Sequence, residues 1–364
     1  MNPTKLLMIS TDRKIFEEDS AVRARMIEYG KLFGETHIIV FAKNNRQPTT
    51  DNRRLSDNTF VYSTNSLSKF FYIFDAVRIG KSVIENCKPA RPAGGLKIEN
   101  CLITTQDPFE CGLVGWRLAR KFKIPLELQI HTDIGSPYFT SLKLGWRLAT
   151  LNFLRFQSAR FLLPRADKIR VVSVRIKNYL ISRFKIAEAK IEIRPIKIDE
   201  AKIQRAVVSP ENDLRKKYYQ FDFIALAAGR LEPEKNFALA IDVWRAVIKK
   251  FPRAGLIIVG AGSLEKNLKL FAQGGPRKAR QDNVVFEPWT ENLASYYKTA
   301  DVFLNTSFYE GYGMTLAEAV VADCPVISSD VGVIDEIYRS GKKAAICSVG
   351  DKNCFVAEIN RLFK

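Results

Sequence analysis

Short apolar runs alternate with longer segments of helical periodicity along almost the whole chain, with polar or glycine-containing breaks between them. This alternation is typical of βα units, in which parallel strands form a sheet and helices cover its faces. The expected strands span residues 6–9, 37–41, 101–104, 126–130, 169–173, 223–227, 255–259, 284–286, 302–305 and 326–328. The expected helices span residues 21–32, 110–122, 174–184, 238–251, 264–273, 293–299, 315–322 and 335–340.

With 364 residues, the chain is long for one hydrophobic core and fits two domains. We therefore predict an α/β fold with two Rossmann-like, doubly wound domains, residues 1–200 and residues 201–364. Their boundary is expected in the polar stretch 197–219. Two segments, 46–66 and 88–95, are polar or rich in proline and glycine and are predicted to be loops.

The composition, 46% hydrophobic and 26% charged, excludes global disorder and low-complexity architectures. The six cysteines form no C-x-x-C pair and no zinc-ligand spacing, so we expect reduced thiols and a cytoplasmic location. No window of about 18 uninterrupted apolar residues predicts a transmembrane helix. The net charge of +18 favours anionic partners.

A glycine-containing loop precedes one of the expected helices. Residues 310–313 read Glu-Gly-Tyr-Gly and lie between the strand at 302–305 and the helix that begins near residue 314. Free N–H groups and the positive end of the helix dipole attract anions at a helix N-terminus, and glycine lets an anion approach closely. The segment therefore predicts a phosphate-binding loop.

Two carboxylates, Glu310 and Glu318, flank this loop with seven residues between them. A carboxylate repels phosphate, whereas it accepts hydrogen bonds from sugar hydroxyls. The pair and the loop together favour a sugar joined to a nucleotide diphosphate as the ligand. The alternative is a surface turn residue followed by an exposed helix position.

The segment TSFYEGYGMTLAEAVVADCPV, residues 306–326, resembles the E-x7-E signature of the retaining GT-B glycosyltransferases, family 4 in particular. The resemblance continues in order through LLMIS, QIHTD, LPRADKIRVVS, AAGRLEPEKN and IIVGAGSL. It implies two Rossmann-like domains facing a cleft, an acceptor-binding domain at 1–200 and a nucleotide-sugar-binding domain at 201–364. It also implies glycosyl transfer to an acceptor hydroxyl with retained configuration.

The resemblance assigns roles to individual residues. It implies that a basic pair neutralises the departing diphosphate, that one glutamate faces the donor sugar and that a histidine reaches the transferred sugar. The expected catalytic residues are His131, Glu310, Arg230 and Lys235, and the expected substrate-binding residues are Glu318, Gly313, Met314, Thr315, Gly262 and Asp133. For the basic pair, the alternative is surface ion pairing with Glu232 and Glu234.

The chain departs from the family pattern in two loops. The loop after the first strand lacks the usual glycines, and Ser20 is expected to cap the helix that follows it. Asp323 stands where a turn glycine is common, and aspartate tolerates the left-handed conformation better than most residues.

The sequence contains no D-x-D triplet, so we expect no metal and no cofactor beyond the nucleotide-sugar co-substrate. The expected partners are a nucleotide-sugar donor and a glycan or lipid-linked acceptor in cell-surface glycan or glycolipid synthesis.

Basic and large apolar residues mix in 67–81 and 141–170, which favours an anionic membrane surface over a merely solvated basic face. A sugar-nucleotide epimerase or hydrolase of the same fold stays open. A nucleic-acid-binding protein is less favoured, because no binding motif accompanies the charge.

Overall fold

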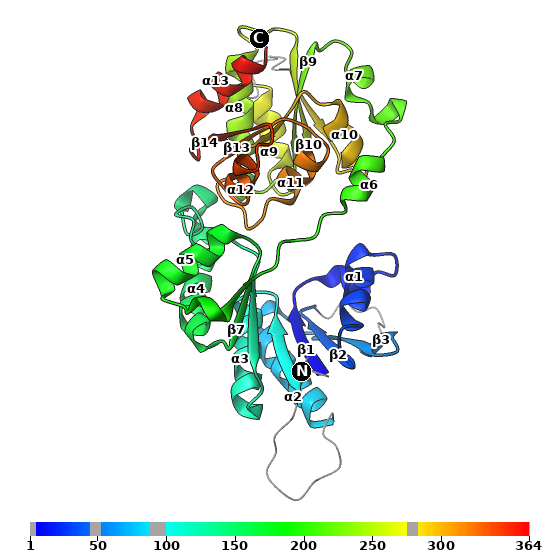
Figure 1. Ribbon diagram of the computed structural model, residues 1–364, viewed down its shortest axis with the longest axis vertical. Coiled ribbons are helices and arrows are strands. Elements are labelled where there is room, and N and C mark those ends of the chain that lie inside the picture. The colour runs from blue at the N-terminus through cyan, green and yellow to red at the C-terminus, as the bar shows by residue number, and fades with distance from the viewer. Residues whose placement is uncertain (1–4, 44–51, 87–99, 275–282, 364) are drawn as a thin grey trace, which may run out of the picture. The chain divides into compact units, whose positions relative to one another are not determined.

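The computed structural model describes residues 5–43, 52–86, 100–274 and 283–363, and the chain divides into two compact units (Figure 1). Unit 1 comprises residues 1–131 and 151–194, and unit 2 comprises residues 132–150 and 195–364. The sequence predicts one boundary at 197–219. The structure also groups 132–150 with the C-terminal half, because aromatic side chains of this segment pack on rings of unit 2.

Unit 1 is built on an eight-stranded sheet in the order β3-β4-β2-β1-β5-β6-β7-β8. All neighbouring strands are parallel except β3 and β4. The strands are β1 (Lys5–Ser10), β2 (Glu35–Val40), β3 (Asn52–Ser56), β4 (Thr59–Ser63), β5 (Cys101–Thr105), β6 (Leu126–Ile130), β7 (Lys168–Val171) and β8 (Ile191–Ile193). The helices are α1 (Ala21–Gly30), α2 (Tyr72–Asn86), α3 (Glu110–Phe122), α4 (Trp146–Leu162), whose first turn belongs to unit 2, and α5 (Val174–Phe184).

Local chemistry explains the start of α1. The Ser20 hydroxyl accepts a hydrogen bond from the Val22 N–H at 3.1 Å, which confirms the expected N-cap. The loop prediction for 46–66 is wrong over 52–63, where β3 and β4 form an antiparallel hairpin. The weak alternation in this polar segment concealed the hairpin, whose turn residues are Asp57 and Asn58. The loop predicted at 88–95 lies outside the described residues.

Unit 2 holds a six-stranded parallel sheet in the order β11-β10-β9-β12-β13-β14. The strands are β9 (Phe223–Ala228), β10 (Ala254–Val259), β11 (Val284–Glu287), β12 (Val302–Asn305), β13 (Val326–Ser329) and β14 (Ala344–Cys347). The helices are α6 (Glu200–Arg205), α7 (Leu214–Lys217), α8 (Phe237–Val247), α9 (Glu265–Ala272), α10 (Leu293–Thr299), α11 (Met314–Val321), α12 (Ile334–Arg339) and α13 (Lys352–Leu362).

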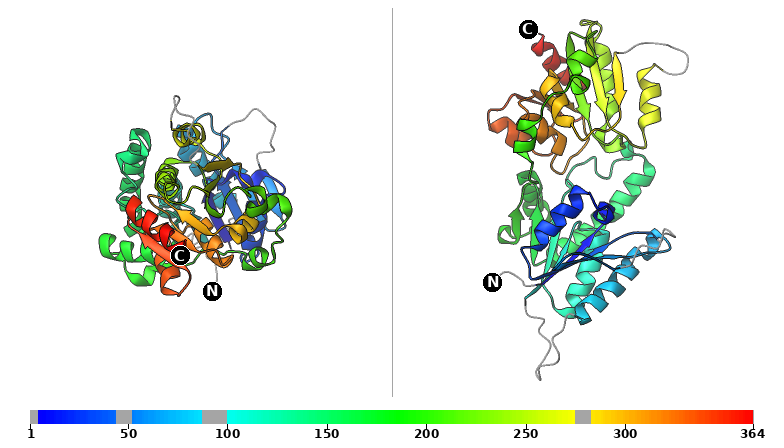
Figure 2. Two further views of the ribbon diagram at one scale, coloured as in Figure 1. Left: turned by 90° about the horizontal axis from the view of Figure 1, so that it is seen from above. Right: turned by 90° about the vertical axis from the view of Figure 1, so that its right-hand side faces the viewer.

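Helices cover both faces of the sheet in unit 2 (Figures 1 and 2). One core cluster joins alternate residues of β9 and β10 to α8, α9 and α13, and the other joins the remaining residues to α7, α10 and α11. The predicted doubly wound α/β architecture is therefore confirmed. Asp323 has a φ of +58°, so the left-handed turn expected there is also confirmed.

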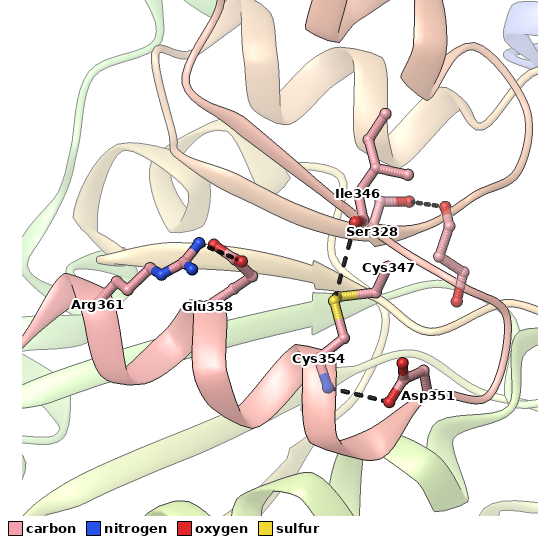
Figure 3. Close-up of a disulfide and its surroundings, with 8 residues drawn as sticks. Ser328, Ile346, Cys347, Asp351, Cys354, Glu358 and Arg361 are labelled. Atoms are coloured by element: carbon pink, nitrogen blue, oxygen red, sulfur yellow. Dashed lines mark hydrogen bonds and ion pairs between the residues drawn. A yellow bond between two sulfur atoms is a disulfide. The ribbon is translucent and has the colours of Figure 1, made fainter.

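Two cysteines form a disulfide, Cys347 at the end of β14 and Cys354 in the first turn of α13 (Figure 3). The expectation of reduced thiols is wrong for this pair. The turn between the two elements brings the Cα atoms within 5.7 Å, although the spacing of seven residues matches no common motif. Cys111 and Cys324 are free thiols, and Cys87 lies outside the described residues.

A buried carboxylate stabilises the edge of the sheet in unit 2. Glu287 ends β11, is 8% exposed and accepts hydrogen bonds from the hydroxyls of Tyr218 and Tyr296. Lys217 lies 2.7 Å from the same carboxylate. Desolvation opposes ionisation of Glu287, but hydrogen bonds from Lys217, Tyr218 and Tyr296 outweigh it and lower the pKa. Its stabilising contribution is therefore present above the ordinary pKa of about 4.3, and it is lost as the pH falls through the lowered value of the folded state.

Replacing Glu287 with glutamine is expected to destabilise unit 2 by about 2–3 kcal/mol, because Lys217 and the two tyrosines lose a charged acceptor. The measurement is the urea midpoint of the unfolding transition at pH 7. Glu291→Gln, at an exposed position in the following loop, is the control. Equal midpoints for the two variants would contradict this account of the carboxylate.

Candidate functional site

Four loops follow the carboxyl ends of β9, β10, β12 and β13, at one edge of the parallel sheet in unit 2. Open α/β sheets bind ligands at this edge. Two of the loops touch closely: a Cβ on Gly260 would lie 1.9 Å from the Gly229 carbonyl oxygen, and Gly260 has a φ of +156°. The expected site residue Gly262 also permits a close backbone contact, since a Cβ there would lie 2.5 Å from the Leu231 carbonyl oxygen. Both glycines let the loops after β9 and β10 pack backbone to backbone.

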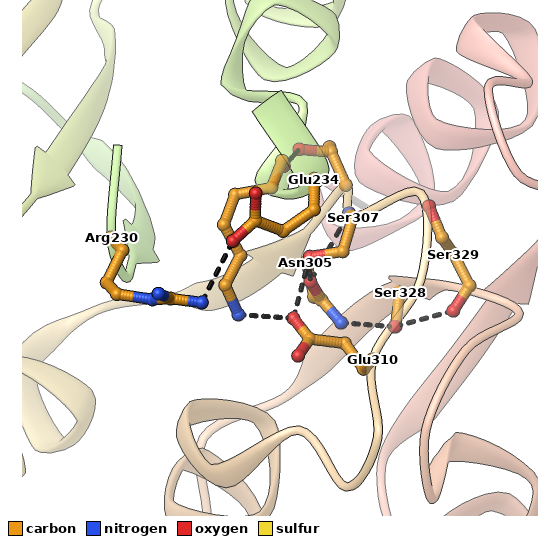
Figure 4. Close-up of polar contacts among 9 residues, drawn as sticks. Arg230, Glu234, Asn305, Ser307, Glu310, Ser328 and Ser329 are labelled. Carbon is orange, nitrogen blue, oxygen red and sulfur yellow. Dashed lines mark hydrogen bonds and ion pairs between the residues drawn. The ribbon is translucent and has the colours of Figure 1, made fainter. Parts of the chain in front are cut away.

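The centre of the candidate site is an ion pair between two predicted residues (Figure 4). Lys235 Nζ lies 2.5 Å from Glu310 Oε1, and the two side chains are 16% and 12% exposed. The Ser307 hydroxyl lies 2.8 Å from the same glutamate oxygen and 2.7 Å from Asn305 Oδ1. The Asn305 amide group in turn donates to Ser328 at 3.1 Å. The structure therefore fixes the Glu310 carboxylate from the loop after β9 and from the ends of β12 and β13.

Backbone contacts join the same loops. The Phe308 N–H donates to the Glu234 carbonyl oxygen at 2.8 Å, and the Thr306 hydroxyl donates to the carbonyl oxygens of Lys235 and Asn236. Asn236 has a φ of +49°, which turns the chain into α8. These contacts place the Lys235 ammonium beside the glycine-containing loop.

Arg230, the other member of the predicted basic pair, remains largely open to solvent. Its guanidinium lies 2.9 Å from Glu234, and its side chain is 76% exposed (Figure 4). This ion pair is the one that the alternative interpretation predicts for Arg230. For Lys235, the structure shows a different partner, Glu310.

The predicted phosphate-binding loop has the expected form. Gly313 has a φ of +91° and immediately precedes α11. Met314 and Thr315 are therefore the first two residues of that helix. The N–H groups of a first helical turn have no carbonyl partner inside the helix, and the helix dipole adds a partial positive charge there. The loop and the helix N-terminus therefore form an anion-binding geometry with the residues that the sequence indicates.

Glu318 lies on the second turn of α11 and contacts a residue that the sequence analysis missed. The hydroxyl of Tyr297, on α10, donates to Glu318 Oε2 at 3.2 Å. Desolvation raises the pKa of Glu318, while the Tyr297 hydrogen bond and the charge of Lys202 oppose that rise. Tyr297 is itself fully buried, and its pKa is well above the ordinary value. One Glu318 oxygen is thus anchored by Tyr297, and the carboxylate keeps further acceptor capacity.

The loop after β13 packs against the backbone of the glycine-containing loop. Gly332 has a φ of +58°, and a Cβ there would lie 2.4 Å from the Tyr312 carbonyl oxygen. The Val333 N–H donates to that same oxygen at 3.0 Å. The backbone of Tyr312 is thus held by a contact that only glycine permits at position 332.

The segment 132–150 contributes to unit 2 through its aromatic rings. Tyr138 stacks on Phe308 with ring centroids 5.1 Å apart, and Phe139 meets Tyr309 edge-on at 5.7 Å. These two contacts hold the residues just before Glu310. Asp133, a predicted binding residue, is 8% exposed and accepts a hydrogen bond from the Gly135 N–H at 2.9 Å, which shapes the start of this segment.

His131, the remaining predicted residue, directly follows β6 in unit 1 and is exposed. Its Nε2 lies 3.1 Å from Gln129 Oε1. Partial desolvation of the ring, followed by the charges of Arg170 and Arg25, lowers its pKa below the ordinary value of about 6.5. The imidazole is therefore neutral at pH 7.

The residues that sequence reasoning missed hold the predicted ones in place. They include Tyr297 beside Glu318, Asn305 and Ser307 beside Glu310, and Gly332 behind Tyr312. A weak signal was present for Asn305 and Ser307, since two polar residues at the end of a buried strand are unusual in a core. No sequence spacing indicates Tyr297.

Residues 211–364, which include all of these unit 2 loops, match the family described as Glycosyl transferases group 1. An alpha-monoglucosyldiacylglycerol synthase of Streptococcus pneumoniae is 29% identical over 62% of this chain and 51% of its own length. An uncharacterized glycosyltransferase of Haemophilus influenzae is 32% identical over 28% of each chain. The first three curated relatives are matched over only 28–41% of their own length.

A crystal structure of Anabaena Alr3699/HepE in complex with UDP-glucose superposes with a TM-score of 0.70. It is 17% identical in sequence, and the superposition covers 99% of this chain and 90% of that one. The structural likeness shows the GT-B fold, and the family match with the glycosyltransferase relatives supports a glycosyltransferase.

Replacing Gly332 with alanine is expected to weaken the binding of nucleoside diphosphates to unit 2 by about tenfold. The added methyl group meets the Tyr312 carbonyl oxygen and displaces the loop that carries Gly313. Gly341→Ala is the matched control, because Gly341 has a φ of +76° and open space around the position of a Cβ. Both variants strain a left-handed residue by about 1–2 kcal/mol, so only the clash distinguishes them. Isothermal titration calorimetry with UDP is the measurement, and equal affinities would contradict the role of Gly332.

Proposed function

We propose that this protein transfers a glycosyl group from a nucleotide-diphosphate sugar to an acceptor hydroxyl, with retention of configuration and without a metal. One observation carries the proposal. A half-buried lysine–glutamate pair, Lys235 and Glu310, lies beside the glycine loop that opens α11, within the residues matched by the family model. This arrangement combines a cation, an anion-binding helix N-terminus and a carboxylate within one edge of a sheet.

The chemistry follows from the charges. A departing nucleoside diphosphate gains negative charge in the transition state, and the fixed charge of Lys235 stabilises it together with the N–H groups of Met314 and Thr315. Arg230 is exposed and is free to turn from Glu234 toward a phosphate, because surface ion pairs are weak. Acceptor attack on the face that the diphosphate leaves, assisted by a leaving-group oxygen, needs no enzymic nucleophile. This route gives the retained configuration of family 4.

The two glutamates suit the sugar moieties of the donor. Glu318 retains acceptor capacity beyond its contact with Tyr297 and would accept hydrogen bonds from the ribose hydroxyls. Glu310 would accept from hydroxyls of the transferred sugar, while its ion pair with Lys235 keeps the carboxylate oriented before the donor binds.

Uridine diphosphate glucose is the donor that we propose first. The Anabaena protein was crystallised with UDP, with UDP and glucose, and with UDP-glucose. The loops after β9, β12 and β13 in this chain would provide the phosphate and hydroxyl contacts that such a donor requires. A sugar-nucleotide epimerase or hydrolase of the same fold is the alternative, and the glycosyltransferase relatives do not favour it.

A lipid-linked or glycan acceptor at a membrane surface completes the proposal, and it places the protein on the cytoplasmic face in cell-surface glycan synthesis. In unit 1, Leu67, Phe70 and Phe74 are 82%, 88% and 66% exposed at the start of α2. Lys69 and Arg78 are close to them in sequence. Exposed aromatic residues beside cations suit the interface of an anionic bilayer. Among the described residues, no helix is long and apolar enough to cross a membrane.

Turnover of UDP-glucose tests the central proposal. Lys235→Ala and Glu310→Gln are each expected to lower UDP release by more than tenfold, because each removes half of the ion pair at the reacting centre. Lys269→Ala, which breaks an exposed lysine–glutamate pair on α9, is the control and is expected to keep the wild-type rate. Rates are measured with EDTA present, with candidate acceptors and without them.

A wild-type rate in Lys235→Ala, or a rate that EDTA abolishes, would contradict the proposed mechanism. Turnover that is fully independent of any acceptor would favour the epimerase or hydrolase instead.

Vesicle binding tests the membrane surface. The protein is expected to co-sediment with vesicles of phosphatidylglycerol and phosphatidylcholine but not with phosphatidylcholine alone, and Phe70→Ser with Phe74→Ser should reduce binding by at least fivefold. Leu32→Ser is the control, because Leu32 is 65% exposed elsewhere in unit 1. Binding that is unchanged in the double variant would rule out this patch as the contact surface.

A further inference from the structure

Strand β6 of unit 1 carries polar residues where a parallel core strand is normally apolar. Its sequence with the next residue is LELQIH, so Glu127, Gln129 and His131 alternate with three buried aliphatic residues. Glu127 is 5% exposed and Gln129 is 4% exposed. Burying two such side chains costs free energy unless each polar atom has a partner. The hydrogen-bond partners of Glu127 and Gln129 therefore indicate the function of these buried side chains.

The partners form a continuous hydrogen-bond chain of four residues. Thr104, on the neighbouring strand β5, is fully buried and donates its hydroxyl proton to Glu127 Oε1 at 2.9 Å. The Thr104 oxygen accepts from the Gln129 amide group, also at 2.9 Å. Gln129 Oε1 then lies 3.1 Å from His131 Nε2. The chain runs from a buried carboxylate to the exposed imidazole at the end of the strand.

The direction of each hydrogen bond follows from the carboxylate at the start of the chain. The Thr104 hydroxyl has a single proton, and it donates this proton to Glu127 Oε1. The threonine oxygen must then accept from the Gln129 NH2 group, which turns the Gln129 carbonyl toward His131. A carbonyl oxygen only accepts, so the proton between these two residues belongs to His131 Nε2.

We propose that Glu127, Thr104 and Gln129 are positioning residues that hold His131 as the Nε2–H tautomer, so that its Nδ1 carries a lone pair available to the substrate. The inference rests on the proposed glycosyl transfer and on the role in sugar contact that the resemblance to family 4 implies for His131. No described residue forms a hydrogen bond with Nδ1. The imidazole therefore presents an acceptor, and a sugar hydroxyl is a donor of matching chemistry.

Two nearby cations favour the neutral state of this imidazole. Arg170 lies beside Gln129 on β7, in register with it, and its Nε is buried without a hydrogen-bond partner. Partial desolvation, followed by the charges of Arg170 and Arg25, lowers the pKa of His131. A neutral acceptor suits a reaction in which the sugar develops positive charge, because an imidazolium would repel that charge.

The tautomer of His131 is directly measurable, because the chain contains only two histidines. Long-range 1H–15N correlation spectra of 15N-histidine-labelled protein at pH 7 report the protonation of each ring nitrogen, and a His37→Gln variant assigns the signals. Wild-type protein is expected to show His131 as a single neutral Nε2–H form. An imidazolium or an Nδ1–H form would overturn the proposal.

Glu127→Gln keeps the size of the side chain but replaces a pure acceptor with a group that also donates. The direction of the hydrogen bonds from residue 127 to His131 is then no longer fixed, so a signal from the Nδ1–H tautomer is expected to appear. The kcat with UDP-glucose should fall about tenfold at a similar KM. Thr104→Ser retains the hydroxyl and is expected to keep the wild-type spectrum and rate. Thr105→Val is the control for lost stability, since Thr105 is the next residue on β5, equally buried, and bonds to the Asp107 carbonyl oxygen instead.

Three results for Glu127→Gln would count against the proposal. The first is a spectrum identical to that of the wild type, and the second is a kcat equal to that of Thr105→Val. The third is a changed spectrum with an unchanged kcat, because turnover would then not depend on the tautomer. The spectra need no substrate. If the protein turned over no nucleotide sugar, the proposed function would fail, while the tautomer measurement would still test the hydrogen-bond chain.

Discussion

The ion pair between Lys235 and Glu310 is the contact on which the geometry of the unit 2 loops depends. It joins the loop after β9 to the loop after β12, and the half-buried environment strengthens the attraction between the charges. Ser307 and Asn305 extend the contact to the end of β13. These contacts join three loops at one edge of the sheet, so the position of each loop restricts the positions of the other two.

Elements with strong periodicity and clear ends were predictable from the sequence. Strand β6 and helix α3 have the predicted bounds, because the alternating aliphatic residues of β6 and the amphipathic pattern of α3 each stop at residues of a different kind. The glycine loop before α11 was predictable for the same reason, since Gly313 and the following helix define an anion site through the backbone alone. Local chemistry of this type depends on neighbours in sequence.

Features that depend on distant partners could not be predicted. The contact of Tyr297 with Glu318 joins two helices, and the packing of Tyr138 on Phe308 joins segments that lie 170 residues apart in sequence. The disulfide depends on how β14 turns into α13. For Lys235, the sequence offered Glu232 and Glu234 as partners three and one residues away, whereas the fold supplies Glu310 from another loop. Tertiary packing decided each of these cases.

The disulfide between Cys347 and Cys354 also bears on how the sheet of unit 2 avoids pairing with other chains. An edge strand exposes unpaired backbone groups, and charged side chains are one common defence. The edge strands β3 and β8 of unit 1 carry exposed charged residues, among them Arg54 and Glu192, whereas Ala344–Cys347 of β14 carries none. This apolar edge is only four residues long, and the disulfide ties its last residue to the first turn of α13. The covalent link therefore holds the end of this short, uncharged edge strand against α13.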